Sequence, residues 1–294
     1  MNLCAPWGRL RRRLWLLLGL ALCCPALHAG SYSCAIASVS GISLVYDPFA
    51  PTQTLGTGTV AINCTKSGGN ASTVYYELGI NGGLGLSGGQ SRASNGSAWI
   101  GYSTWRDSAN TQAWSDLTSN RIKGSLSFTT SSTVYLNYYI TIPAGQNVGA
   151  GTYLDTQTLK LYQGDTATAA STDISPTQQT FGMSFSVVPK CFLSSPPGDV
   201  HFSYTSFQTT ASVASTSFAV TCQNNTSYSM ALDATSGTLL GLNYSLSLSK
   251  TGPQTGNGLA QSASINGSMA KGQSGTCSGG ACTASEPRTL TISY

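Results

Sequence analysis

The sequence predicts an all-β protein of two Ig-like β-sandwich domains, the second of which lacks its last strand. Short runs of alternating apolar and polar residues recur along the chain, as in Val74–Ile80, and this pattern is typical of half-buried strands. Turn-forming residues separate the runs, a spacing that favours a β-sandwich. No stretch after the N-terminal segment has a helical period. The pattern of strands also repeats, which predicts two copies of one fold.

The N-terminus predicts export. Residues 1–29 have the features of a secretory signal peptide: a basic stretch that includes Arg9 and Arg11 to Arg13, an apolar run from Leu14 to Cys24, and a small residue, Ala29, at the expected cleavage point. The apolar run is too short to cross a bilayer. The remaining residues divide into an N-terminal domain over 30–189 and a C-terminal domain over 190–294.

Removal of the signal peptide leaves a chain without net charge. Four of the 14 Lys and Arg residues lie in the signal peptide, so ten basic residues remain against 10 Asp and Glu. Charged residues make up only 8% of the sequence, against about a quarter in an average protein. This composition leaves no basic stripe that could bind nucleic acid or an anionic membrane.

The cysteines predict three disulfides. Three of the 9 cysteines leave with the signal peptide, and an even number remains in an exported chain. Thirty residues separate Cys34 from Cys64 and thirty-one separate Cys191 from Cys222, so we expect each pair to join two early strands of its own domain. Cys277 and Cys282 enclose four small residues, and we expect them to pin a loop. A metal site is not expected, because no second ligand pair or histidine lies nearby.

The N-terminal domain contains an alternating run for each expected strand. The runs are marked by Ile42, Leu44 and Tyr46; by Val60, Ile62 and Cys64; by Val74, Tyr76, Leu78 and Ile80; by Val134, Leu136 and Tyr138; by Leu159 and Leu161; and by the closing run from Phe181 to Val187. Residues 163–179 are rich in Thr, Ala and Ser, and we expect an exposed loop there.

The C-terminal domain repeats this order up to its last run. Val200, Phe202 and Tyr204 correspond to Ile42, Leu44 and Tyr46, while Leu290, Ile292 and Tyr294 correspond to the run at 158–162. The closing run has no counterpart. We therefore expect an unpaired edge and a groove lined by these six residues, Val200, Phe202, Tyr204, Leu290, Ile292 and Tyr294. Such an edge invites a strand from another chain. The alternative is a sandwich closed by a different strand order.

A glycine-rich segment at residues 81–89 contains Leu84 and Leu86 with no period that would bury them. One interpretation is a tight turn whose leucines fold back onto the sheet. The other is a projecting loop that offers apolar side chains to a target. Trp99, Trp105 and Trp114 follow, and each is interpreted as a core or sheet-covering residue.

The residues needed for catalysis are missing from the pattern. His201 is the only histidine that remains after cleavage, and it stands beside strand residues where a solvent-facing side chain is expected. No Ser-His-Asp arrangement, metal cluster or phosphate-binding glycine loop can be assembled. The acids are scattered, without a pair suited to glycoside hydrolysis. We therefore expect no enzyme and no cofactor.

Several motifs resemble the spore coat protein U domain family, which supplies the subunits of archaic, Csu-type chaperone–usher pili. In the first domain they are Cys34, Tyr46–Pro48, Thr57–Thr65, Arg92, Trp114, Pro143–Gln146 and Gly151–Thr156. In the second they are Phe202–Tyr204, Val220–Cys222, Gly272–Gln273 and Leu290–Tyr294. The second copy is the weaker one, because it lacks counterparts of Arg92 and Trp114 and has Cys277–Cys282 in place of the Gly-Thr-Tyr run.

The resemblance implies a pilin that lacks its seventh strand, is held by a periplasmic chaperone, and receives the N-terminal donor strand of the adjacent pilin at the outer-membrane usher. A two-domain member is similar to a tip adhesin. Only four residues precede Cys34 after cleavage, whereas a donor strand needs roughly ten at about 3.3 Å each. We therefore expect a chain that accepts a strand, gives none, and is carried through the periplasm to the pilus tip at the cell surface.

The resemblance also implies hydrophobic loops that attach to external surfaces and seed biofilms, and Leu84 and Leu86 are the candidates. In an ordinary Ig strand order their loop would face the second domain, while residues 66–72 and 163–179 would lie at the far end. Two other functions stay open. One is a structural pilus or coat subunit without an adhesive role. The other is a secreted, lectin-like binding protein that acts alone.

Overall fold

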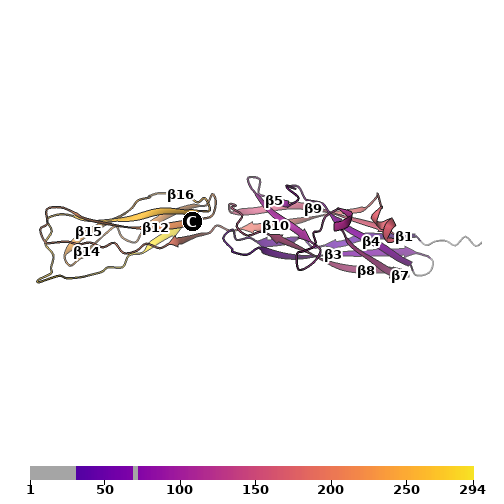
Figure 1. Ribbon diagram of the computed structural model, residues 1–294, viewed down its shortest axis with the longest axis horizontal. Helices are drawn as coiled ribbons and strands as arrows, with labels where there is room; N and C mark the ends of the chain where they lie inside the picture. The colour runs from indigo at the N-terminus through magenta and orange to yellow at the C-terminus, as the bar shows by residue number, and fades with distance from the viewer. Residues whose placement is uncertain (1–30, 69–71) are drawn as a thin grey trace, which may run out of the picture.

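The computed structural model describes residues 31–68 and 72–294 (Figure 1). The predicted signal peptide, residues 1–29, lies outside the described residues. The regular structure of the described residues is almost entirely strand, with one short helix, α1 (Ala167–Ser171), and one 3-10 turn, η1 (Thr118–Asn120). The predicted all-β class is confirmed. Helix α1 falls inside the expected loop at 163–179, and five residues are too few to give the sequence a helical period.

Ten strands between residues 31 and 187 form one sandwich. They are β1 (Ser31–Val39), β2 (Ile42–Val45), β3 (Thr54–Ser67), β4 (Ser72–Ile80), β5 (Ser91–Ser94), β6 (Trp99–Trp105), β7 (Ile122–Phe128), β8 (Ser131–Ile142), β9 (Gly151–Gly164) and β10 (Thr177–Val187). Pairing runs in the order β1-β3-β8-β6-β5-β9-β10-β2, and β4 joins β9 to β7. Strand β6 connects the two layers because it pairs with both β5 and β8.

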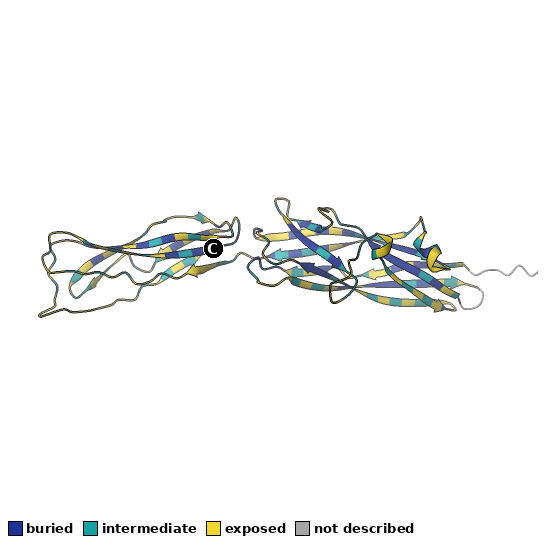
Figure 2. Ribbon diagram, in the orientation of Figure 1, coloured by how far each residue is buried: buried dark blue, intermediate teal, exposed yellow. Residues whose placement is uncertain are grey.

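The core of this sandwich follows from the alternation in the sequence. Over parts of β3, β4, β8 and β10 every second side chain is apolar and buried, among them Val60, Ile62, Ile140 and Phe185, none of which is exposed at all (Figure 2). Burial of each such side chain contributes about 1.5–3 kcal/mol. Two layers with one apolar face each are thus joined through a single core.

Eight strands form the second sandwich: β11 (Cys191–Ser195), β12 (Ser212–Cys222), β13 (Ser227–Leu232), β14 (Ser236–Leu239), β15 (Leu242–Leu248), β16 (Gln254–Thr255), β17 (Ala260–Met269) and β18 (Leu290–Ser293). A five-stranded sheet, β11-β12-β17-β15-β14, faces a three-stranded one, β16-β13-β18. Its core around Phe218, Val220 and Tyr228 shares no residue with the first core. We therefore propose domains at residues 30–189 (domain one) and 190–294 (domain two), which lie end to end (Figure 1).

Each domain has a disulfide between its first strand and the next long one. Cys34 of β1 bonds Cys64 of β3, and Cys191 of β11 bonds Cys222 of β12, in both cases directly across the strand pair. These are the pairs that the spacing predicts, and Cys277–Cys282 forms the third disulfide. In the chain-entropy model, each of the two crosslinks that join residues 30 or 31 positions apart contributes about 3–4 kcal/mol.

The two domains meet through aromatic and polar contacts. The rings of Phe49 and Phe192 pack edge to face with centroids 5.2 Å apart. The side-chain amide of Gln223 donates a hydrogen bond of 3.1 Å to the carbonyl of Val148, and both residues are buried. The junction is therefore packed in addition to being connected by the chain.

A cluster of charged side chains joins β4 and β7 to the segment between β6 and β7. Glu77 is buried and contacts Lys123 at 2.8 Å, Arg121 at 3.3 Å and the hydroxyl of Ser171. Arg121 also lies 3.5 Å from Asp116. The cluster therefore links two acids that the sequence places far apart, with a cation between them. Its ion pairs and hydrogen bonds hold these elements together.

Candidate functional site

One hydrogen-bonded corner is built around a buried tyrosine of domain one. The hydroxyl of Tyr46 donates to the carbonyl of Pro143 at 2.9 Å and accepts from the backbone N–H of Gln146 at 2.9 Å. The Gln146 side chain accepts from the N–H of Gly101 at 2.7 Å and donates to its carbonyl at 2.9 Å. This corner fixes the loop after β8 against the end of β2 and the middle of β6.

Domain two contains the same corner. The hydroxyl of Tyr204 donates to the carbonyl of Ala270 at 2.8 Å and accepts from the N–H of Gln273 at 2.9 Å. The Gln273 side chain accepts from the N–H of Asn243 at 2.7 Å and donates to its carbonyl at 2.9 Å. Tyr204 therefore occupies the position of Tyr46, and Asn243 that of Gly101. The correspondence expected from the sequence is thus visible bond by bond.

A second polar cluster lies inside domain one beside β9. The hydroxyl of Tyr102 donates to Asp155 and accepts from the side-chain amide of Gln157, which also donates to Asp155 at 3.0 Å. Burial, together with the bond to Asp155, raises the pKa of Tyr102 well above its ordinary value, so the hydroxyl keeps its proton. Phe185 of β10 packs edge to face on the Tyr102 ring at 5.1 Å.

Domain two repeats this cluster with charged residues. The hydroxyl of Tyr244 donates to Glu286 at 2.7 Å and accepts from Arg288 at 2.9 Å, and Arg288 contacts Glu286 at 2.6 Å. Burial and the bond to Glu286 raise the pKa of Tyr244 in the same way. This correspondence is not among the expectations from the sequence. The available signal was position: Asp155 and Glu286 each stand four residues before the first leucine of the last matching run.

The two clusters and the two corners align the domains strand by strand. Segment 199–204 corresponds to β2, and β18 to the second half of β9. In domain one, β10 lies between these two elements: it pairs antiparallel with β9 from Thr177 to Val187 and parallel with β2 from Met183 to Ser186. The side chains of Phe181, Met183 and Phe185 then fill the core.

In domain two no described strand takes the place of β10. Strand β18 pairs with β13 alone among the described strands. Residues 199–204 form no strand, and no backbone hydrogen bond joins them to another segment in the described part of the chain. The expectation of a strand at Val200–Tyr204 is therefore wrong. The alternating residues are present, but a strand also needs a partner ladder, and here it has none.

Five of the six predicted groove residues come together at this open edge. Val200, Phe202, Tyr204, Leu290 and Ile292 pack as half-buried side chains against the domain-two core. Phe202 and Val200 also lie on Gly267 of β17, where a Cβ atom would lie within 3 Å of both side chains. Four of their five counterparts in domain one, including Tyr46 and Leu159, are buried, and Leu44 is partly buried. The sixth residue, Tyr294, is 60% exposed and lies at the domain junction instead.

The glycine-rich segment lies on the flank of domain one. Its backbone is fixed by Asp155, which accepts from the N–H of Leu84 at 2.8 Å, and by Arg92, which donates to the carbonyl of Gly85 at 2.7 Å. Leu84 is 77% exposed and Leu86 is 58% exposed. The two leucine side chains are therefore exposed, while the backbone of the loop is held against the sheet.

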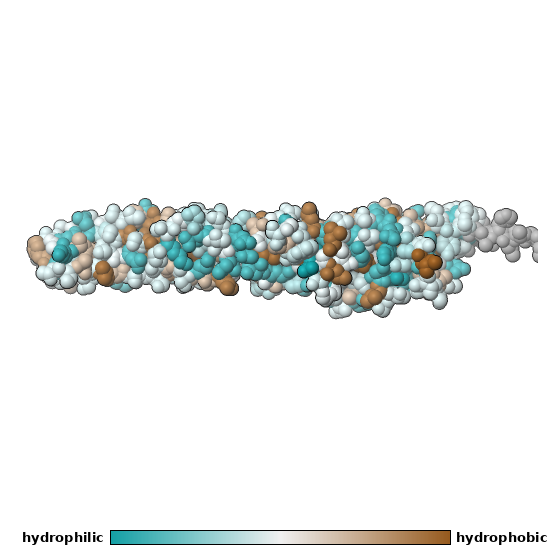
Figure 3. Space-filling view, turned by 90° about the horizontal axis from the view of Figure 1, so that it is seen from above, coloured by the Kyte–Doolittle hydropathy of each residue, from teal (hydrophilic) through white to brown (hydrophobic). Residues whose placement is uncertain are grey.

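Other apolar side chains surround this loop. Gly85 lies against the ring of Trp99, which Arg92 also covers at 4.8 Å, and Trp99 is 44% exposed. Ser94 pairs with Trp99 on one side and with the exposed Leu154 on the other, so both lie in one row of the sheet. The hydrophobic areas visible in Figure 3 are small and scattered. Trp114, by contrast, is a core residue, as the sequence predicts.

The far end of domain one is mainly polar, but Ile174 of the 163–179 loop is 94% exposed there. Lys66, the end of β9 and helix α1 gather there, with the backbone N–H of Lys66 bonded to the carbonyl of Thr130 and α1 packed against β9 (Figure 1). Part of the loop at 66–72 lies outside the described residues. The sequence placed both polar loops at this end, and the described parts of them are there. The glycine-rich loop, which the sequence places toward domain two, contacts Asp155 and Gln157 in the half of β9 that begins near the junction.

No catalytic or metal-binding constellation appears among the described residues. His201 is 86% exposed, and its nearest acid, Asp199, lies 3.9 Å away at the surface. No group of three His, Cys, Asp or Glu side chains in the described part of the chain could hold a metal ion. Among the same residues no helix is long and apolar enough to cross a membrane.

Comparison with known families and structures gives the following relatives. Residues 24–160 match the family model of the Spore Coat Protein U domain, so the resemblance seen in the motifs is confirmed for this part of the chain. No curated protein matches the chain.

Two solved structures are similar in fold. The first is the CsuC-CsuE chaperone-tip adhesion subunit pre-assembly complex from archaic chaperone-usher Csu pili of Acinetobacter baumannii. It is 14% identical with a TM-score of 0.43, and the match covers 89% of this chain and 100% of that one. The second is the CupB6 tip adhesin from Pseudomonas aeruginosa. It is 10% identical with a TM-score of 0.40, and the match covers 90% of this chain and 95% of that one.

Proposed function

We propose that the protein is the tip adhesin of a chaperone–usher pilus. Domain two accepts the N-terminal strand of the adjacent pilin, and domain one contacts an external surface or ligand. The carrying observation is the open edge between β18 and segment 199–204, which in domain one is filled by β10. An exposed pair of strand edges above half-buried apolar side chains is what strand addition requires.

Domain one predicts the geometry of the accepted strand. By analogy with β10, the strand runs antiparallel to β18 and parallel to segment 199–204, and it directs every second side chain inward. The inward residues of β10 are Phe181, Met183, Phe185 and Val187, so the donor needs four apolar residues at alternate positions. The same edge would be covered by a periplasmic chaperone before assembly at the outer-membrane usher, on the way to the cell surface.

The test is a chain that carries its own donor. A copy of residues 164–187 is appended after Tyr294, because Tyr294 takes the position of Gln163. The appended strand should raise the free energy of unfolding of domain two by at least about 3 kcal/mol, since it buries four apolar side chains at 1.5–3 kcal/mol each and loses part of that gain to chain ordering. Urea unfolding of the fused and unfused chains measures the difference.

The matched control carries the same extension with those four apolar residues of the copy replaced by asparagine. Equal stability of the two fusions would refute strand acceptance. It would leave a secreted binding protein that acts alone.

The adhesive role rests on the exposed leucines of the flank loop. Replacing both, Leu84→Ser and Leu86→Ser, should reduce attachment of the purified chain to an alkyl-coated surface by about tenfold or more, because two exposed apolar side chains lose about 1.5 kcal/mol each on a nonpolar contact. Surface plasmon resonance on that coating gives the measurement. The control is Leu117→Ser, which removes an equally exposed leucine elsewhere on domain one. Unchanged attachment of the double variant would assign contact to another face.

A further inference from the structure

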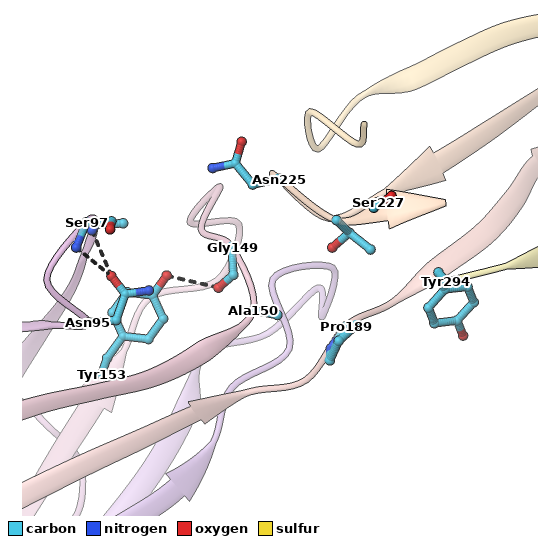
Figure 4. Close-up of a pocket in the computed structure, with 11 residues that line it drawn as sticks. Asn95, Ser97, Gly149, Ala150, Tyr153, Pro189, Asn225, Ser227 and Tyr294 are labelled. Carbon is cyan, nitrogen blue, oxygen red and sulfur yellow. Dashed lines mark hydrogen bonds between the residues drawn. The ribbon is translucent and has the colours of Figure 1, made fainter. Parts of the chain in front are cut away.

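A pocket of about 450 Å³ lies where the two domains meet (Figure 4). Domain one contributes Asn95, Ser97 and Ala150, and domain two contributes Asn225 and Tyr294. None of its lining side chains belongs to an acidic or basic residue. The hydroxyl oxygen of Thr226 in its wall is buried and has no hydrogen-bond partner among the described residues. The pocket is therefore suited to a neutral, polar occupant rather than to an ion.

The pocket lies at one end of the open edge. Strand β18 ends there, because Tyr294 lines the pocket next to Pro189, which precedes the first strand of domain two. Figure 4 shows Tyr294 and Pro189 on neighbouring segments at this end. A strand that runs antiparallel to β18 must begin where β18 ends. The first residues of an accepted strand therefore approach the pocket.

The strand register determines how far the first residues of the accepted strand extend toward the pocket. Leu78 of β4 pairs with Leu161, and its counterpart Met230 pairs with Ile292, so Ile292 matches Leu161. In domain one Thr177 lies opposite Leu161. The residue of the accepted strand that matches Thr177 thus lies opposite Ile292, and the residue two places before it lies opposite Tyr294. Each earlier residue extends the strand by about 3.3 Å into the junction.

We propose that the junction pocket receives the N-terminal end of the strand accepted by domain two, so that one strand contacts both domains. This inference rests on the proposed strand acceptance. Amide and hydroxyl groups such as those of Asn95, Ser97 and Asn225 match the N–H and C=O groups of an extended backbone. The occupant is accordingly a peptide segment with uncharged side chains that begins about three residues before the one that matches Thr177.

The test uses two peptides copied from this chain. The short one is residues 177–187, the strand that closes domain one, and the long one is residues 174–187. Binding of each to the chain that begins at residue 30 is measured by fluorescence anisotropy with the dye at the C-terminal end. We expect the long peptide to bind at least about tenfold more tightly. The substitution Ala150→Trp, which fills the pocket at an exposed position, should abolish that difference and leave the short peptide unaffected.

Two further variants complete the experiment. Ser97→Trp fills the pocket from the facing hairpin and should act like Ala150→Trp, whereas Ala113→Trp, an exposed alanine outside the pocket, should change neither affinity. Equal affinity of the two peptides for the unmodified chain would overturn the junction inference while strand acceptance stands. Failure of both peptides to bind would overturn strand acceptance and the junction inference with it.

Discussion

At the scale of single residues, Glu77 is a buried acid whose carboxylate forms ion pairs with Arg121 and Lys123. Burial raises the pKa of its carboxyl, but hydrogen bonds from Lys123 and Ser171 and the positive charge of Lys123 outweigh burial, so the pKa lies below its ordinary value. Arg121 adds a further contact at 3.3 Å. The carboxylate is therefore ionised in the folded protein over the whole neutral range.

This lowered pKa predicts an acid-sensitive contribution to stability. A carboxyl with a depressed folded pKa stabilises the protein above its unfolded pKa, about 4.3, and the contribution is lost as the pH falls through the folded pKa. Glu77→Gln should cost about 3 kcal/mol at pH 7, since it leaves two cations near an uncharged side chain. The difference from wild type should shrink toward zero in acid. Urea unfolding at a series of pH values measures it.

The control for that series is Asp199→Asn, because Asp199 is exposed and the nearest basic side chain, His201, lies 3.9 Å away. This variant should match wild type at neutral pH. A Glu77→Gln difference that stayed constant from pH 7 to pH 2 would show that the side chain acts through its shape and not through its charge.

At the scale of elements, the first strands of the two domains are held with unequal strength. Strand β1 pairs with β3 at eight positions, from Ser31 to Val39. Strand β11 pairs with β12 at four positions only, and it leads into the unpaired segment 199–204. Within domain two, the disulfide Cys191–Cys222 therefore restrains β11 more, relative to its ladder, than Cys34–Cys64 restrains β1.

Removing each disulfide should separate these two cases. The pair Cys191→Ser with Cys222→Ser should destabilise domain two by about 3–4 kcal/mol and release β11, because few ladder bonds remain to hold it. Hydrogen exchange at the amides of residues 191–195 should then become fast. The matching pair in domain one, Cys34→Ser with Cys64→Ser, should leave the amides of β1 protected. Equal loss of protection in both domains would contradict this account.

Most strands could be predicted because alternation reports which face of a strand is buried. The alternation at Val200, Phe202 and Tyr204 predicts that these side chains face the core. They do so, yet these residues form no strand. Alternation carries no information about a partner. The alternation of apolar residues does not predict that β9 begins at Gly151, because the inward-facing side chains of its first half include polar ones such as Asp155 and Gln157. Their role depends on Tyr102, which the sequence places far away.

At the scale of the whole molecule, the junction decides how the two domains are held relative to each other. The pair Phe49–Phe192 and the ion pair between Lys190 and Asp47 at 2.5 Å connect the domains beside the linker. Both lie near the pocket that Pro189 helps to line. A packed junction keeps the open edge of domain two at a fixed place relative to domain one.

Loosening this junction should change motion and leave each domain folded. Phe192→Ala removes an aromatic contact of about 0.5–1.5 kcal/mol. Distances between spin labels placed in the two domains should broaden, while the unfolding midpoint of domain one stays unchanged. The control Val213→Ala, at an exposed position away from the junction, should leave the distances as they are. An unchanged distribution for Phe192→Ala would assign the rigidity to the other contacts.

The direction of the strands has a mechanical consequence. In both domains the long strands run along the long axis of the molecule (Figure 1). Tension between its two ends therefore shears a ladder such as β3–β8, which is paired from Thr54 to Thr65, and does not peel it open. Sheared hydrogen bonds share the load and fail together, whereas peeled ones fail in turn. The sandwiches should thus resist pulling, and the first part to yield should be the short junction between them.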